Sequence, residues 1–153
     1  LQVAPLRRTL AIGLLLASPV PLVLAHRLPA AANHATTAEG VEPYSATRLA
    51  ALRAEGRVVF VDMTADWCVT CKANEKAVSS RDAFKESMQQ ADAVFMQGDW
   101  TNVDPAITAF LEQHNAVGVP LYVVFPNDGG EGEVLPTVLT QDVVADALAR
   151  AKR

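Results

Sequence analysis

Hydrophobic and polar positions divide the last two thirds of the chain into predicted strands and helices. Residues 58–63 and 121–125 are almost entirely apolar, which is typical of central strands covered on both faces. One charged residue, Asp62, interrupts the first of these runs. Shorter runs at residues 93–97 and 133–135 predict two more strands, the last one at an edge.

Apolar residues three and four positions apart predict the helices. The expected helices span residues 45–54, 68–78, 82–91, 104–114 and 140–151. Ser45, Asp104 and Thr140 are predicted N-caps, because their side-chain oxygens accept hydrogen bonds from the first free N–H groups of a helix. From residue 57 the resulting order is strand, two successive helices, strand, helix, strand, strand, helix.

The N-terminal segment has a different pattern. Residues 9–25 carry no charge and follow Arg7 and Arg8. Such a run is typical of a short transmembrane helix or of a cleaved secretory signal peptide, and both interpretations stay open. In either case the two arginines lie on the cytoplasmic side and the later residues on the far side of the membrane.

Three parts follow from these patterns: a hydrophobic segment over residues 1–28, a flexible linker over 29–44 and one α/β domain over 45–153. The first residue is Leu rather than Met, so we expect a piece of a longer protein. The net charge of -4 and the lack of a Lys/Arg cluster argue against nucleic-acid binding.

The only two cysteines, Cys68 and Cys71, are spaced Cys-x-x-Cys between the predicted strand 58–63 and a helix. Cys68 then begins the helix, where free N–H groups and the helix dipole favour a thiolate. We therefore predict a redox pair in which Cys68 is the nucleophile and Cys71 resolves the mixed disulfide. A structural disulfide would constrain the unfolded chain little, and no histidine has a zinc-ligand spacing to the pair.

Two residues near the cysteines have a predicted role. Asp62 lies inside an apolar strand, where burial raises the pKa of a carboxyl and prepares it to take the proton from Cys71. A strand-end carboxylate that reaches water is the alternative. Trp67 precedes Cys68 directly and is predicted to cover the site.

The element order, together with Trp67-Cys68-Val69-Thr70-Cys71-Lys72, resembles the thioredoxin fold, a mixed β-sheet flanked by helices. Within that superfamily, residues 61–72 resemble the C-terminal periplasmic domain of the DsbD family of membrane thiol:disulfide interchange proteins. Residues 99–101, 118–122, 134–136 and 139–140 are also similar to that family. The resemblance runs from about Tyr44 to the end, and the segment before it resembles a last membrane helix.

The resemblance implies further site residues. In thioredoxin-like proteins the proline matching Pro120 is cis and faces the cysteines, so the backbone of Val119 is expected to pair with an extended substrate. DsbD-like domains carry an acid at Glu75, which would help Asp62 hold protons on the dithiol. A solvated helix charge is the alternative for Glu75. No metal or cofactor is expected.

The function implied is a protein-disulfide reductase without a cofactor. It would take electrons from a membrane-embedded dithiol and pass them to oxidised periplasmic proteins, as a periplasmic domain tethered to the bacterial inner membrane. Two alternatives stay open. One is a separately secreted thioredoxin-like reductase or disulfide oxidant, and the other is a module in which Cys68 and Cys71 bind a soft ion such as copper(I).

Overall fold

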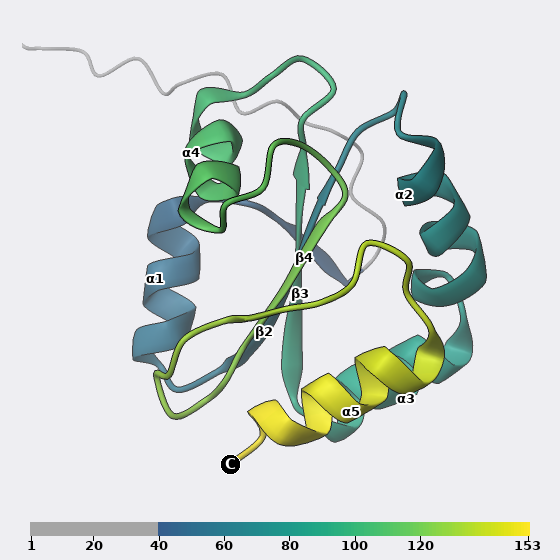
Figure 1. Cartoon of the computed structure of the whole chain (residues 1–153). Helices are drawn as coiled ribbons and strands as arrows, with labels where there is room; N and C mark the ends of the chain where they lie inside the picture. Colours follow the sequence, from purple (N-terminus) through teal and green to yellow (C-terminus); the bar gives the residue numbers. More distant parts are fainter. Residues whose placement is uncertain (1–39) are drawn as a thin grey trace, which may run out of the picture. The chain divides into compact units, whose positions relative to one another are not determined.

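A computed structural model of the chain describes residues 40–153. Five strands form one sheet in the order β1-β3-β2-β4-β5 (Figure 1). β1 and β2 both run parallel to β3, whereas β4 runs antiparallel to β2 and to β5. The strands are β1 (Val41–Pro43), β2 (Val58–Thr64), β3 (Ala93–Asp99), β4 (Leu121–Phe125) and β5 (Glu133–Val134).

Helices cover both faces of this sheet (Figure 1). One face is covered by α1 and α4, and the other by α2, η1, α3 and α5. The helices are α1 (Ala46–Ala54), α2 (Val69–Asn74), η1 (Glu75–Ser79), α3 (Asp82–Gln90), α4 (Pro105–Gln113) and α5 (Gln141–Ala151). Ser45, Asp104 and Thr140 cap α1, α4 and α5 through their side chains, as the sequence predicts.

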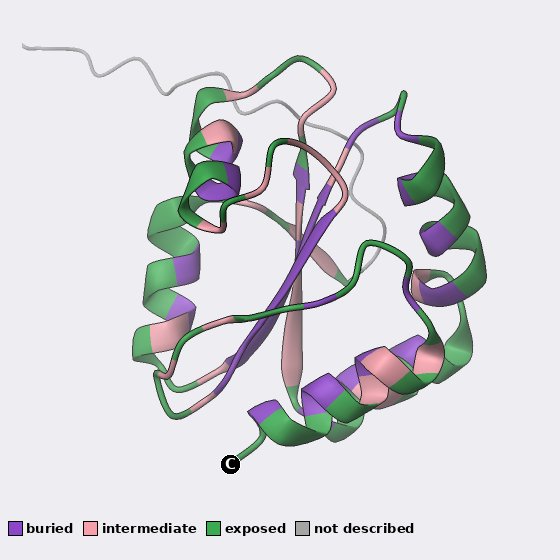
Figure 2. Cartoon of the chain, in the orientation of Figure 1, coloured by how far each residue is buried: buried purple, intermediate pink, exposed green. Residues whose placement is uncertain are grey.

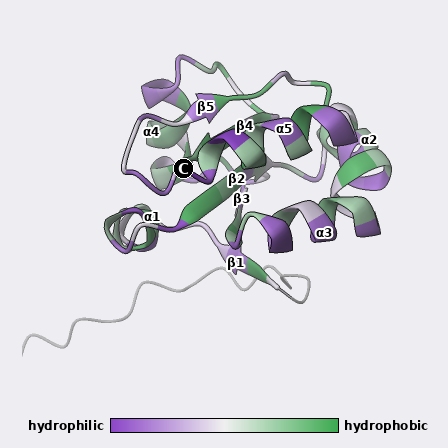
Figure 3. Ribbon diagram, turned by 90° about the horizontal axis from the view of Figure 1, so that it is seen from below, coloured by the Kyte–Doolittle hydropathy of each residue, from purple (hydrophilic) through white to green (hydrophobic). Residues whose placement is uncertain are grey.

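Strand β2 supplies side chains to both hydrophobic cores, because successive residues of a strand point to opposite faces. Val59, Val61 and Met63 pack toward α1 and α4, while Val58 and Phe60 pack toward α3 and α5. The strand is buried along its length (Figure 2). Seen from below in Figure 3, the sheet lies between α1 and α4 on one side and α2, α3 and α5 on the other. The predicted mixed sheet flanked by helices is confirmed.

Two details differ from the sequence prediction. Residues 41–43, at the end of the predicted linker, form the edge strand β1 and pair with β3. The sequence did not predict this strand, because so short a run shows no alternation of apolar and polar residues. The predicted helix 68–78 changes form after Asn74, where α2 gives way to the π-helical turn η1. π-helical turns inside α-helices are frequent at functional sites.

The predicted hydrophobic segment at residues 1–28 lies outside the described residues, as does most of the predicted linker. Between residues 40 and 153, every helix is too short or too polar to span a bilayer.

Candidate active site

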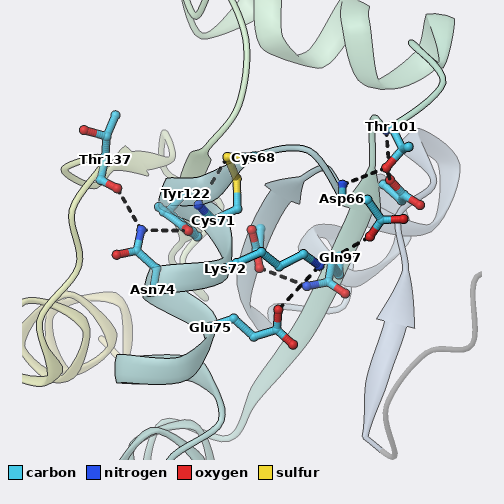
Figure 4. The surroundings of a disulfide bond; sticks show 12 residues. Asp66, Cys68, Cys71, Lys72, Asn74, Glu75, Gln97, Thr101, Tyr122 and Thr137 are labelled. Atoms are coloured by element: carbon cyan, nitrogen blue, oxygen red, sulfur yellow. Dashed lines mark hydrogen bonds and ion pairs between the residues drawn. A yellow bond between two sulfur atoms is a disulfide. The ribbon is translucent and has the colours of Figure 1, made fainter.

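Cys68 and Cys71 lie at the start of α2 and are joined by a disulfide bond (Figure 4). Cys68 is the N-cap of the helix, and the N–H of Cys71 donates to its Sγ at 3.2 Å. Both cysteines are buried, and Ala65 and Val119 pack with them. When the pair is reduced, the helix N–H groups face the sulfur of Cys68 rather than that of Cys71, which favours a Cys68 thiolate.

Asp62 is a buried carboxyl in β2. Gln97, its partner in the register of β3, donates from Nε2 to Oδ2 of Asp62 at 3.0 Å. The other oxygen, Oδ1, accepts no hydrogen bond from the described residues. Burial raises the pKa of Asp62 from 3.8 to about 6, although the hydrogen bond from Gln97 opposes the rise. A carboxyl with such a pKa can accept and return a proton near neutral pH.

Two charges on the cysteine-bearing helix also act on this carboxyl. The negative charge of Glu75 raises the pKa of Asp62, and the positive charge of Lys72 lowers it. The Glu75 side chain is itself exposed, and its carboxylate lies 3.7 Å from Nζ of Lys72. The same Nζ lies 3.3 Å from Oδ1 of Asp66 (Figure 4). Glu75 therefore influences the site through its charge, from solvent, and Lys72 partly offsets that charge.

Val119 and Pro120 lie at the same end of the sheet as the disulfide. The peptide bond between them is cis, and β4 begins at the next residue, Leu121, which is paired with Met63 near the end of β2. Val119 packs against the cluster of Ala65, Cys68 and Cys71.

Trp67 is more than half exposed, yet several contacts hold it in place. Its Nε1 donates to the carbonyl of Thr101 at 3.3 Å, and its ring lies 6.1 Å from that of Trp100. The hydroxyl of Thr101 accepts from the N–H of Asp66 at 2.9 Å and donates to Oδ1 of Asp99. The turn that follows β3 thus fixes the turn that carries the cysteines.

Asn74 is a buried residue that sequence reasoning missed. Its Nδ2 donates to the hydroxyl of Tyr122 at 3.0 Å and to the carbonyl of Thr137 at 2.8 Å, and its Oδ1 accepts from the N–H of Leu139 at 3.1 Å (Figure 4). The amide therefore joins the cysteine helix to β4 and to the segment before α5. The signal was present, since Asn74 lies three residues after Cys71 and so on the same helix face.

Gln97 was missed for a different reason, because its importance depends on the register of β2 and β3. The structure brings together Cys68, Cys71, Asp62, Trp67 and Val119 with Pro120, while Glu75 stays at the rim. Within residues 40–153, no three His, Cys, Asp or Glu side chains gather as metal ligands would.

Comparisons with known proteins place this geometry among relatives. The thiol:disulfide interchange protein DsbD of Yersinia pestis (strain Pestoides F) is 35% identical over 79 residues. The protein of that name from Escherichia coli (strain K12) is 35% identical over 82 residues. These matches cover 52% and 54% of this chain but 13% and 14% of the relatives, so the chain corresponds to a small part of their length.

Solved structures share the fold. The oxidised C-terminal domain of Neisseria meningitidis DsbD is 23% identical, with a TM-score of 0.57 over 72% of this chain and 97% of that one. A thioredoxin variant from Halobacterium salinarum is 25% identical, with a TM-score of 0.55 over 76% of this chain and 96% of that one. The predicted thioredoxin fold is therefore confirmed, and the similarity to DsbD proteins agrees with the predicted resemblance. Since residues 41–127 match the family model described as thioredoxin-like, the chain belongs to the thioredoxin-like family.

Proposed function

We propose that this chain is a thiol:disulfide oxidoreductase that reduces disulfide bonds in other proteins. One observation carries the proposal: Cys68 and Cys71 form a disulfide at the start of α2, and the preceding strand, β2, holds the buried carboxyl of Asp62. The similarity to the thiol:disulfide interchange protein DsbD supports the same chemistry.

The reaction begins with the reduced pair. The Cys68 thiolate attacks one sulfur of a partner disulfide, forms a mixed disulfide and releases the other partner sulfur as a thiolate. Asp62 then accepts the proton of Cys71, whose thiolate attacks Sγ of Cys68. The Cys68–Cys71 disulfide forms, and the second partner thiolate leaves. Two electrons pass from the pair to the partner, and the released thiolates are protonated from Asp62 and water.

Two features favour the reducing direction. The residues between the cysteines, Val69 and Thr70, carry no positive charge, so nothing there adds to the stability of the Cys68 thiolate. The negative charges of Asp62 and Glu75 oppose a second negative charge at the dithiol. A less stable thiolate makes the pair more reducing, because strong oxidants are those whose reduced form is stabilised.

The partners are proteins in this proposal. The exposed side chains of Trp67 and Val69 flank the disulfide, and Val119 packs against the cysteines. Electrons would come from a membrane-embedded dithiol, and oxidised periplasmic proteins would receive them. The domain would be periplasmic and tethered to the inner membrane, a proposal supported by the similarity to DsbD.

A redox equilibration tests the direction. The full chain is equilibrated with a series of thiol/disulfide buffers, and the fraction of oxidised Cys68–Cys71 is counted by alkylation and mass spectrometry. We expect a potential nearer that of thioredoxin, about −270 mV, than that of DsbA, about −120 mV. A value close to that of DsbA would replace the reductase with an oxidant. A pair that never exchanges with the buffer, yet binds copper(I) when reduced, would support the metal-binding alternative instead.

A further inference from the structure

The turn after β3 carries a backbone conformation that its sequence does not favour. Residues 100–103 form this turn, which the N–H of Val103 closes by donating to the carbonyl of Trp100 at 3.0 Å. Val103 has a φ of +55°, in the left-handed region. A β-branched residue is a true outlier there, because its side chain crowds the backbone.

Comparison with similar positions shows that the residue type is unusual. Between residues 40 and 153, the other non-glycine residues with positive φ are Asp92 and Asn115. Aspartate and asparagine tolerate this region because their short polar side chains bond locally to the backbone. Valine has no such compensation, so the turn would be more stable with Asn or Gly in place of Val103.

Burial does not offset this cost. The side chain of Val103 is 58% exposed, and it belongs to neither core of the domain. Its neighbours in the chain are polar, with Asn102 in the turn, Asp99 at the end of β3 and Asp104 at the N-cap of α4. Strained backbone conformations of this kind cluster at active sites and ligand-binding surfaces.

The same turn carries the supports of Trp67. The carbonyl and hydroxyl of Thr101 bind the Trp67 indole and the Asp66 backbone, and Trp100 packs on the Trp67 ring. Val103 therefore projects from a turn that is rigidly joined to the cysteine turn. The two joined turns thus each present an exposed apolar side chain, Trp67 on one and Val103 on the other.

We propose that Val103 is a specificity-determining residue, which contacts an apolar side chain of the polypeptide that carries the partner disulfide. This inference rests on the proposed function. The contact would select proteins with an apolar residue near the reacting disulfide, and a small disulfide such as glutathione disulfide would be too short to reach it.

The test compares two disulfide substrates. The reduced full chain is oxidised in single turnovers by insulin, as the protein-disulfide probe, and by glutathione disulfide, and the second-order rate constant gives kcat/KM. Val103→Thr keeps the shape and the branched Cβ but replaces a methyl group with a hydroxyl. We expect kcat/KM for insulin to fall about fivefold, because a hydroxyl is costlier to bury than a methyl group. The rate with glutathione disulfide should be unchanged.

Three further variants separate contact from stability. Val103→Ile should keep the insulin rate, whereas Val103→Asn should raise the Tm and lower that rate. Val134→Thr makes the identical change on an exposed valine of the edge strand β5 and should leave both rates unchanged.

Equal insulin rates for the parent and Val103→Thr would overturn the inference. So would an equal loss with both substrates, or a change in oligomeric state without a change in kcat/KM, which would assign Val103 to a contact between copies of the chain. Failure of the reduced parent to reduce either disulfide would instead contradict the proposed function.

Discussion

The disulfide has two unlike surroundings. On the side of the sheet lie Asp62, Gln97, Asn74 and Tyr122, which are wholly or partly buried and joined by hydrogen bonds. On the side of solvent, Trp67 is exposed and fixed from below by the turn after β3. Buried polar side chains thus lie on the protein side of the disulfide, and an exposed apolar side chain lies on its solvent side.

This contrast separates two tasks. A buried carboxyl responds strongly to nearby charge because little water screens it, so the inner side is suited to hold and move a proton. An exposed indole gains little inside the domain itself, and its area becomes useful when a partner covers it. Changes on the inner side should therefore alter pH dependence and stability, while changes on the outer side should alter the choice of partner.

The largest effect is expected from removing the resolving thiol. In Cys71→Ala the Cys68 thiolate still attacks a partner disulfide, but nothing releases the product, so turnover stops and mixed disulfides accumulate on Cys68. Non-reducing gels and mass spectrometry detect the adducts. Adducts that form with Cys68→Ala and not with Cys71→Ala would reverse the two roles.

Asp62→Asn should slow thiol–disulfide exchange by about 100-fold, which is at the low end of the contribution expected from general acid–base catalysis. In the parent, resolution of the mixed disulfide should speed up as pH rises through about 6, where Asp62 becomes a carboxylate. Asp62→Asn should lose this rise, because an amide cannot accept the proton. Rapid-quench measurement from pH 5 to 8 shows the difference, and matching profiles would remove Asp62 from the mechanism.

The same substitution should stabilise the fold. The pKa of Asp62 is raised by folding, so its protonation favours the native state, and that stability is full below pH 3.8 and lost as pH rises through about 6. A rise of roughly two pKa units corresponds to about 3 kcal/mol. Urea unfolding at pH 7 should therefore show Asp62→Asn to be more stable than the parent by that order. A less stable variant would mean that the carboxylate has a hydrogen-bond donor besides Gln97.

Removing the buried amide tests the other inner group. Asn74→Ala would leave the Leu139 N–H, the Thr137 carbonyl and the Tyr122 hydroxyl without their partner, at a cost of about 2–4 kcal/mol in the free energy of unfolding. Tyr122→Phe removes one of these bonds and should cost about 1 kcal/mol. Equal costs would indicate that Asn74 acts only through Tyr122.

The smallest effect is expected at the exposed acid. Glu75→Gln removes a negative charge that raises the pKa of Asp62, so the rise of the exchange rate should move to lower pH. Solvent and Lys72 screen this charge, so the maximal rate should change less than with Asp62→Asn. Lys72→Gln is the matched control and should move the profile to higher pH. Shifts in the same direction for both variants would exclude a charge effect.

Much of this arrangement is readable in the sequence. Apolar runs locate β2 and β4, N-capping residues locate three helices, and the Cys-x-x-Cys spacing locates the reacting sulfurs. These features are local, because each depends on residues a few positions apart. Asp62 stands out for the same reason, as a charge within an apolar run.

The parts that escaped prediction depend on distant pairing. Gln97 and Asp62 are 35 positions apart in the sequence, and they meet only because of the register in which β2 pairs with β3. Asn74 meets Thr137 and Leu139 across more than sixty positions. Strand β1 has three residues and no apolar alternation, so only its partner β3 reveals it. Pairing of this kind follows from the assembled fold, and for Asn74 the only local signal is its place on the same helix face as Cys71.

The placement of Trp67 and Trp100 has a spectroscopic consequence. They are the only two tryptophans of the chain, and their rings lie 6.1 Å apart beside the turn that carries Cys68. Disulfides quench indole emission, so nearly all the intrinsic fluorescence of this protein arises where the bond opens and closes. The unlabelled molecule therefore carries its own optical reporter of oxidation state, and each of the reactions above can be followed as a change in light.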